Sequence, residues 1–238
     1  MKKILILGAT SELGKAISVI FSNSNHLILI GRDKEKLSKI ASKCQKYDPN
    51  KIEYFYHDFS KESTLIPEEN FKNIDVVINL ISSTSRLADS KIVIESFISY
   101  IVTDLNNIFL MLTNQIIPNT KKIKIIHISS VIEEIRTPDR YLYSSIKTIF
   151  RVFLKALVKD RQNIDTLIVN IGTVIDHKNE SKKANKIAKK ILNSHSLGHL
   201  KLNIGISGAI LKIIFNLNPM LANMTINFIR LFKIKEKK

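Results

Sequence analysis

The sequence contains few of the residues on which disulfide-bonded and metal-binding proteins depend. It has 238 residues, with one cysteine, Cys44, and no tryptophan. A single cysteine excludes an intrachain disulfide and suits a reducing, cytoplasmic setting. The six histidines show no metal-ligand spacing with carboxylates or cysteine, so we predict no metal site. His57 and His127 fall at the ends of predicted strands and are interpreted as structural.

Acidic residues are scarce as well, since 21 Asp and Glu stand against 37 Lys and Arg, for a net charge of +16. Such a charge raises the question of a nucleic-acid or anionic-membrane partner. The lysines are scattered, few aromatic residues are interleaved with them, and no nucleic-acid-binding motif is present. We therefore expect no nucleic-acid partner and attribute the charge to a bias shared by the whole chain.

A secretory leader pattern is also missing. Met1-Lys2-Lys3 precedes only a short apolar run before Gly8, and no cleavage pattern follows. Hydrophobic residues make up 45% of the chain, so a folded protein is expected. Its length is enough for one α/β domain with a substantial core and too short for a second large one.

What the sequence does contain is a regular alternation of apolar strands and helices. Continuous apolar runs are typical of parallel strands that are buried on both faces. The predicted strands are 3–7, 27–30, 52–56, 75–79, 124–128 and 166–171, with a further short one at 202–206. Helices are predicted from the turn after Gly8 to 21, and at 91–115, 143–159 and 180–194. This order predicts a Rossmann-type, doubly wound parallel α/β sheet in one domain, 1–206, with a C-terminal helical extension, 207–238.

The turn after the first strand runs from Gly8 to Gly14 and leads directly into the first helix. Gly8 permits a tight turn, and Gly14 permits close packing and a close approach to a ligand. The free N–H groups and the partial positive charge of a helix N-terminus favour a pyrophosphate. Thr10, Ser11 and Leu13 complete the predicted dinucleotide contacts of this turn.

Cofactor preference depends on Arg32 and Asp33, which follow the second strand. An acid at this place binds a free ribose 2′-hydroxyl, whereas an Arg accepts a 2′-phosphate. Arg32 comes first, and a guanidinium matches a phosphate in a forked, charge-assisted geometry. Asp33 begins the next helix and is interpreted as its cap. We predict NADP(H) in preference to NAD(H). NAD(H) stays the alternative, because a small shift of the turn would exchange the two roles.

Tyr143 and Lys147 lie four residues apart on a predicted helix, so their side chains share one face. An ammonium favours the ionised form of a neighbouring phenol, and such a tyrosine can exchange a proton with a substrate oxygen. An isolated Tyr-x-x-x-Lys also occurs as a surface lysine beside a half-buried tyrosine. Here, however, Ser130 ends the fifth strand 13 positions before Tyr143, and other polar residues or glycines end the remaining strands. Ligands bind at such strand ends in doubly wound sheets.

These motifs, in this order, resemble the short-chain dehydrogenase/reductase family over nearly the whole chain. The resemblance implies that Tyr143 is the general acid or base and that Lys147 assists it and binds the nicotinamide ribose. It implies that Ser130 positions the carbonyl oxygen. It further implies cofactor contacts at Asp58, which resembles the family's adenine-contacting Asp, and at Asn79, Gly172 and Val174.

Four positions depart from the family pattern. Glu12 replaces a glycine of the turn, Leu80 and the two residues after it replace the rest of an Asn-Asn-Ala-Gly motif, and Ile171 replaces a proline. The family's catalytic Asn, which holds a water in a proton relay, falls on Asp104. A carboxylate can also hold a water, so Asp104 is retained as a catalytic candidate. Asn106 is the alternative occupant of this role.

The resulting hypothesis is an NAD(P)-dependent oxidoreductase that interconverts a ketone and a secondary alcohol by hydride transfer. Its substrate would be a small carbonyl or alcohol, on a sugar or a lipid by a loose likeness to some family members. The resemblance also implies a homodimer or homotetramer. A dinucleotide-binding sensor or scaffold without catalysis is the alternative, motivated by Asp104 and the altered motif after Asn79. A sugar-nucleotide epimerase is disfavoured because no sizeable substrate domain follows Gly172.

The C-terminal extension is apolar and basic. Two apolar stretches, 209–217 and 220–232, are separated by Asn218-Pro219 and interrupted by polar residues. A spanning helix needs about 20 mostly apolar residues, so we predict no transmembrane segment. Two interpretations stay open. The extension either closes the substrate pocket or an oligomer interface, or it docks peripherally on the anionic inner face of a membrane.

Overall fold

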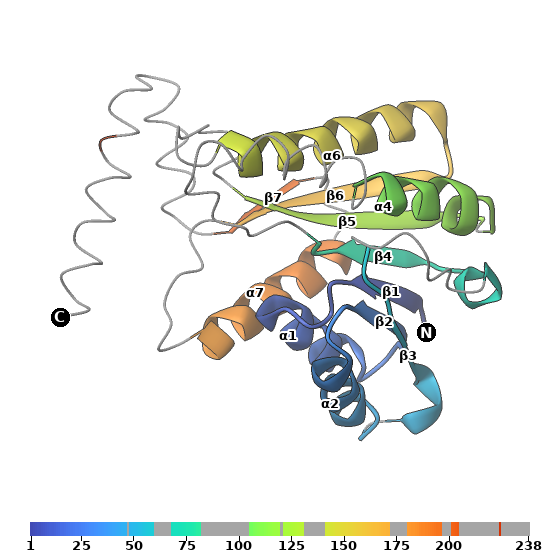
Figure 1. The fold of residues 1–238 in the computed structure, drawn as a ribbon, viewed down its shortest axis with the longest axis vertical. Coiled ribbons are helices and arrows are strands. Elements are labelled where there is room, and N and C mark those ends of the chain that lie inside the picture. Colours follow the sequence, from blue (N-terminus) through green and yellow to red (C-terminus); the bar gives the residue numbers. More distant parts are fainter. Residues whose placement is uncertain are drawn as a thin grey trace.

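The protein, seen here in a computed structural model, is built on a parallel sheet. The structure describes residues 1–46, 48–59, 68–81, 105–119, 121–130, 141–171, 180–196, 201–204 and 224. Within these residues the sheet has seven strands in the order β3-β2-β1-β4-β5-β6-β7, and every neighbouring pair is parallel (Figure 1). The chain moves outward from β1 to β3 and then returns to the other side of β1, so the order reverses there. This confirms the predicted doubly wound Rossmann-type fold.

The apolar runs of the sequence form the strands with small changes at their ends. The strands are β1 (Lys3–Leu7), β2 (His26–Gly31), β3 (Ile52–Tyr56), β4 (Val76–Asn79), β5 (Ile123–Ser130), β6 (Ile164–Ile171) and β7 (Lys201–Ile204). β5 continues two residues beyond its predicted end, so Ser130 is itself a strand residue paired with Ile171.

The described helices are α1 (Glu12–Phe21), α2 (Lys34–Cys44), α4 (Asn106–Leu110), α6 (Tyr141–Asp160) and α7 (Glu180–Ser196). α4 continues as a π-helical segment, Met111–Ile116, and a 3-10 turn, Ile117–Asn119. Further 3-10 turns are Pro49–Lys51 and Glu68–Phe71. The helix predicted for 91–115 is seen from 105 onward, and its earlier part lies outside the described residues.

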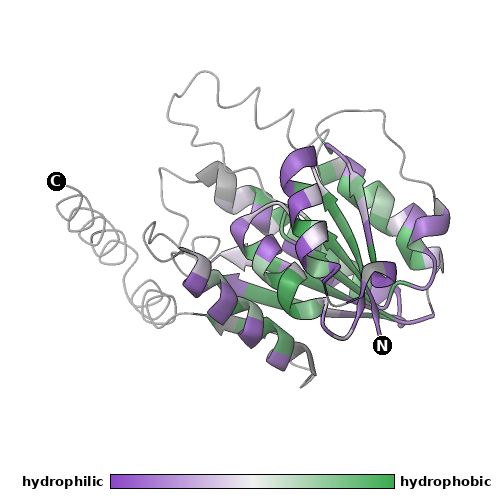
Figure 2. Ribbon diagram, turned by 90° about the horizontal axis from the view of Figure 1, so that it is seen from below, coloured by the Kyte–Doolittle hydropathy of each residue, from purple (hydrophilic) through white to green (hydrophobic). Residues whose placement is uncertain are grey.

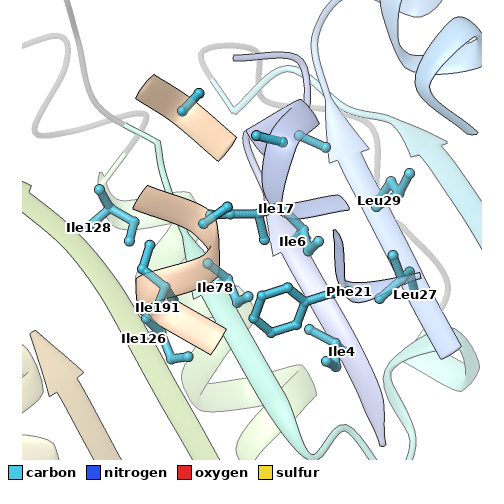
Figure 3. Close-up of a cluster of buried hydrophobic side chains, with 14 of the residues drawn as sticks. Ile4, Ile6, Ile17, Phe21, Leu27, Leu29, Ile78, Ile126, Ile128 and Ile191 are labelled. Atoms are coloured by element: carbon cyan, nitrogen blue, oxygen red, sulfur yellow. The ribbon is translucent and has the colours of Figure 1, made fainter. Parts of the chain in front are cut away.

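One core layer lies between the sheet and helices α1, α2 and α7. Figure 3 shows Ile17 and Phe21 of α1 beside Ile6 of β1, Ile78 of β4 and Ile191 of α7. All five side chains are fully or almost fully buried. The burial of such apolar surface is the main favourable term in folding, and here it packs α1 and α7 onto the sheet.

α4 and α6 cover the opposite face of the sheet (Figure 2), and their outward sides carry both polar and apolar residues. Ile146, Phe150 and Leu154 of α6 are buried, and the half-buried Phe153 and Leu157 pack against the same core cluster. Positions separated by four residues share a helix face, so Leu154 continues the buried stripe. Phe153 instead stacks on Phe109 of α4, with ring centroids 4.0 Å apart.

The C-terminal extension, 207–238, lies outside the described residues except for position 224. Its boundary and both interpretations of it therefore stay predictions. In the part of the chain that the structure describes, no helix is long and apolar enough to cross a membrane.

Candidate functional site

The glycine turn brings the end of β1 into contact with the start of α1. Gly8 has a φ of 85°, a left-handed conformation that glycine adopts without steric cost. Ser11 caps α1, because its Oγ accepts a hydrogen bond from the Gly14 N–H at 3.0 Å and donates one to the Gly8 carbonyl at 2.9 Å. A Cβ on Gly14 would lie 2.4 Å from the Gly8 carbonyl oxygen. The turn is therefore a compact cradle at a helix N-terminus, and this geometry fits a dinucleotide pyrophosphate.

Thr10 and Leu13 are the other two predicted cofactor-binding residues of the glycine turn. A Cβ on Gly31 would lie 2.6 Å from Cγ2 of Thr10, so Thr10 lies directly over the end of β2. Leu13 is half-buried and packs against the core under α1. The turn thus reaches the strand end after which Arg32 follows.

Arg32 and Asp33 have different surroundings. Arg32 is exposed. Asp33 caps α2, because its carboxylate accepts a hydrogen bond from the Lys36 N–H at 3.0 Å and forms an ion pair with the Lys36 ammonium at 3.1 Å. The backbone hydrogen bond, followed by the side-chain contact with Lys36, lowers the pKa of Asp33. The sequence-based interpretation of Asp33 as a cap agrees with this geometry.

Buried polar side chains gather on the α4–α6 face at the carboxyl ends of the central strands. Asn79 of β4 is the register partner of His127 of β5, and Ser129 of β5 is the partner of Asn170 of β6. All four are at most 3% exposed. The Asn79 side-chain oxygen accepts a hydrogen bond from the Ile81 N–H at 3.0 Å and holds the chain as it leaves β4. Burying polar groups is costly, so such a band in an apolar sheet marks a candidate site.

Lys147 comes to this band from α6. It is 3% exposed, and its ammonium donates a hydrogen bond to the carbonyl oxygen of Ile128 at 2.7 Å. Ile128 is two residues before Ser130, which is half-buried at the end of β5. The structure therefore brings Ser130 and Lys147 to one strand end. Tyr143 is in α6, one helical turn before Lys147, but its side chain lies outside the described part of the chain.

His127 is part of this arrangement and was not selected as a site residue from the sequence. It is 1% exposed, three residues before the end of β5, and its ring packs against Phe150 with centroids 4.5 Å apart. Burial, with smaller contributions from the Lys147 and Arg151 charges, holds the pKa of His127 well below its usual value. The imidazole is therefore neutral at pH 7. The sequence signal for it is a histidine flanked by isoleucines within a predicted strand.

A second contact links the end of β3 to α4. Asp58 follows β3 and is half-buried. The next residue, Phe59, is buried, and its carbonyl oxygen accepts a hydrogen bond from the Asn107 side chain at 2.9 Å. Asn107 therefore fixes the loop that carries the predicted adenine contact. No motif pointed to Asn107, because its partner is 48 residues away.

Several predicted residues are not located by the structure. Asp104, Gly172 and Val174 lie outside the described residues, as does the side chain of Asn106. Within the described ranges, no three His, Cys, Asp or Glu side chains come close enough together to hold a metal ion. Cys44 is buried, and burial raises the pKa of its thiol to about 11, so it is protonated at neutral pH.

Comparison with known proteins agrees with this geometry. The family model for short chain dehydrogenase matches residues 2–186. A curated relative, Dehydrogenase/reductase SDR family member 7B of Xenopus laevis, is 28% identical over 190 residues, which are 72% of this chain and 58% of the relative. The chain thus spans less than two thirds of the length of that relative.

Solved structures show the same fold. A short-chain dehydrogenase/reductase of the glucose/ribitol dehydrogenase type from Brucella melitensis has a TM-score of 0.66 and 18% identity, and the match covers 85% of this chain and 94% of that one. A short chain dehydrogenase from Shigella flexneri, complexed with NADP, has a TM-score of 0.60 and 18% identity, with 72% and 77% coverage.

Proposed function

The chain belongs to the short-chain dehydrogenase family of oxidoreductases, and we propose that it uses NADP(H) to interconvert a ketone and a secondary alcohol. The observation that carries this proposal is the position of Lys147. Its ammonium is buried and donates a hydrogen bond to the carbonyl of Ile128, two residues before Ser130. Lys147 itself is one helical turn after Tyr143. A buried lysine is expensive unless it has a task or a partner, and this cost supports a catalytic role for Lys147.

Each of the three side chains has a role that its chemistry suits. The nicotinamide supplies or accepts the hydride. Ser130 donates a hydrogen bond to the substrate oxygen and orients it. Tyr143 gives its phenolic proton to that oxygen in reduction and takes it back in oxidation. Lys147 favours the ionised phenol through its charge and binds the nicotinamide ribose.

The proposed cofactor is NADP(H), with NAD(H) as the weaker ligand. Three facts support this preference. Arg32 is exposed beyond the end of β2, the Asp33 carboxylate is occupied as a helix cap, and a Shigella flexneri relative was solved with NADP. The pyrophosphate would lie on the turn from Gly8 to Gly14. Asp58, Asn79, Gly172 and Val174 are proposed as the remaining cofactor contacts, and Asp104 as the holder of the relay water.

The test compares the wild type with Tyr143→Phe, which removes the exchangeable proton and keeps the ring. Oxidation of NADPH is followed with 2,3-butanedione as an activated ketone, and NADPH affinity is measured by fluorescence titration. We expect the variant to bind NADPH within about threefold of the wild type and to lose at least about a hundredfold in turnover. If both proteins bind NADPH but the variant is as active as the wild type, the enzyme mechanism is wrong. If both bind NADPH and neither reduces any of a panel of ketones, the sensor alternative is favoured.

The proposed assembly is a homodimer or homotetramer formed through the outer face of α4 and α6. Leu110 of α4 is 46% exposed and Val152 of α6 is 56% exposed, beside the half-buried Phe109 and Phe153. Apolar side chains gathered on one surface favour a protein partner, and a second copy offers the same surface. A cytoplasmic location is a further part of this proposal. For 207–238 both interpretations are kept: it closes the substrate pocket or an oligomer interface, or it contacts a membrane peripherally.

A further inference from the structure

We infer that the outer face of α7 is a docking surface for an anionic lipid membrane, on which exposed lysines lie against the headgroups. These lysines are called the lysine stripe, and they are Lys182, Lys186, Lys189 and Lys190. None of them belongs to the proposed cofactor and substrate site, so the inference does not depend on the proposed reaction.

α7 turns one side to the core and the other to solvent. It lies beside α1 (Figure 1), and its inner side consists of the buried residues Ala184, Ile187, Ala188 and Ile191. Because a helix has about 3.6 residues per turn, the lysine stripe falls on the opposite side. All four of its residues are exposed. The stripe is therefore presented to solvent along about two turns of the helix.

The lysine stripe has no counter-charge of its own. None of its ammonium groups forms an ion pair or a hydrogen bond with a residue that the structure describes. The sequence of α7 contains one acidic residue, Glu180, at its first position. Lys186 is four residues from both Lys182 and Lys190, and like charges at this spacing weaken a helix. An anionic surface would remove this repulsion, so the stripe favours an anionic partner.

α2 shows that the stripe is more than the lysine-rich composition of the whole chain. Lysines also lie on the outer side of α2, but acidic residues meet them there. Lys36 forms an ion pair with Asp33 at 3.1 Å, and Lys39 lies 4.0 Å from Glu35. Ion pairs at three- and four-residue spacings stabilise a helix. The two helices share the compositional bias, and only α7 leaves its exposed lysines without acids.

The chemistry of the stripe favours lipid headgroups over nucleic acid. A lysine ammonium is a point charge, whereas readers of nucleic acids also use arginine forks and aromatic rings that stack on bases. The sequence of α7 contains no arginine, phenylalanine, tyrosine or tryptophan. Lysines on an amphipathic helix are attracted to anionic lipids, and each contributes roughly fivefold in affinity near such a surface.

The sequence that follows α7 and β7 suits the same partner. It contains two apolar stretches, 209–217 and 220–232, and further lysines after them. Stable attachment to a membrane takes two signals, such as a hydrophobic element and a basic patch. The composition of 207–238 suits the hydrophobic signal, and the lysine stripe supplies the basic one.

The test is co-sedimentation of the full chain with lipid vesicles. One set of vesicles mixes phosphatidylcholine with phosphatidylglycerol, and the other contains phosphatidylcholine alone. The stripe variant combines Lys182→Gln, Lys186→Gln and Lys189→Gln, because Gln is as good a helix former as Lys and carries no charge. We expect the wild type to bind the anionic vesicles selectively and less tightly as salt rises. The stripe variant should lose about a hundredfold in affinity, at roughly fivefold for each lysine.

The matched control removes the same charge elsewhere. It combines Lys39→Gln, Lys43→Gln and Lys46→Gln, at exposed positions in and just after α2. This control should keep most of the affinity of the wild type for anionic vesicles. An equal loss in the two variants would show that net charge attracts the vesicles, and the inference would be wrong. It would also be wrong if the wild type does not prefer anionic vesicles, or if the stripe variant binds them as the wild type does.

A labelled DNA duplex tests the competing partner by fluorescence anisotropy. A stripe variant that loses DNA binding and keeps vesicle binding would make α7 a nucleic-acid surface and overturn the inference. NADPH titration checks that each variant is folded, and both should bind NADPH as the wild type does. The outcome is independent of the proposed function. A protein that binds vesicles through the stripe without reductase activity keeps this inference and rejects the function, and a reductase that binds no vesicles does the reverse.

Discussion

Gly14 touches Gly8: a Cβ added to Gly14 would lie 2.4 Å from the Gly8 carbonyl oxygen and 2.9 Å from two backbone atoms of Ala9. Real Cβ atoms essentially never come so close, and backbone atoms cannot rotate away as the end of a side chain can. The first turn of α1 therefore rests on the glycine turn, and the two form one unit at the proposed pyrophosphate site.

Gly14→Ala should accordingly displace the start of α1 from the turn. Overpacking of this kind costs about 1–3 kcal/mol of unfolding free energy, which urea denaturation measures, and we expect NADPH affinity to fall at least about tenfold. Gly31→Ala is the comparison, because its new methyl group would meet the side chain of Thr10 rather than backbone. It should cost less stability, and Thr10→Ser should relieve part of that cost by removing the methyl group. Gly14→Ala with native stability and native NADPH affinity would show that the contact is not needed.

Arg32→Ala should weaken NADPH binding and leave NADH binding nearly unchanged. A guanidinium–phosphate pair is a charge-assisted hydrogen bond, and the loss of one such bond, at about 1.5–3 kcal/mol, corresponds to roughly ten- to a hundredfold in affinity. Fluorescence titration with both reduced cofactors measures this. Asp33→Asn is the matched control, because Asn caps helices as well as Asp does, and it should preserve the preference. Tighter binding of NADH than of NADPH by the wild type would end the NADP(H) proposal.

The sequence predicts the order of strands and helices and the glycine turn well, because local residue patterns determine them. Apolar runs such as Ile4 to Leu7 become buried strands, and Gly8 and Gly14 mark a turn whose geometry only glycine tolerates. Apolar periodicity in α6 indicates which side chains face the sheet but not how deeply each is buried. Leu154 is fully buried, whereas Phe153 is half-buried and stacks on Phe109 of α4. Which apolar side chain is buried depends on a neighbour that is remote in sequence.

The polar band is the part that local patterns do not reveal. His127 and Asn170 are buried polar residues in largely apolar strands, and their neighbours depend on sheet register and on the packing of α6. Asp104, Gly172 and Val174 lie outside the described residues, so their roles stay predictions. The altered relay position therefore has to be tested by mutation.

Val152→Glu should convert the proposed oligomer to monomers. Val152 is 56% exposed on α6, and a carboxylate there would have to lose its hydration in an apolar interface. Analytical ultracentrifugation gives the mass in solution. Lys155→Glu changes charge at another exposed position of the same helix and tests for effects of charge alone. If the wild type is itself a monomer at micromolar concentration, this assembly is wrong. If Val152→Glu and Lys155→Glu dissociate it equally, the proposed face is wrong.

His127 should make the protein less stable in mild acid. In the folded state its pKa is held well below the usual value, which applies to the unfolded chain. At a pH between the folded and the unfolded pKa, the unfolded chain therefore binds a proton at His127 and the folded chain does not. The contribution of His127 is fully present above about pH 6.5 and is lost as the pH falls below that value. If the folded ring stays neutral throughout, the loss between pH 7 and pH 5 is about 2 kcal/mol. The carboxylates of Asp33 and Asp48, whose pKa values are also lowered, act at lower pH.

Urea denaturation of the wild type and of His127→Asn at several pH values isolates this effect, because all other titrating groups are shared. His127→Asn is expected to be less stable than the wild type at pH 7, since it leaves a smaller side chain beside Phe150. The difference between the two proteins should then shrink by about 2 kcal/mol as the pH falls to 5. The sign of this change in the stability difference tests whether folding lowers the pKa of His127. A wild type that gains stability relative to His127→Asn in acid would mean that the folded protein binds the proton more tightly than the unfolded chain. The ring would then be an imidazolium in the folded protein in acid.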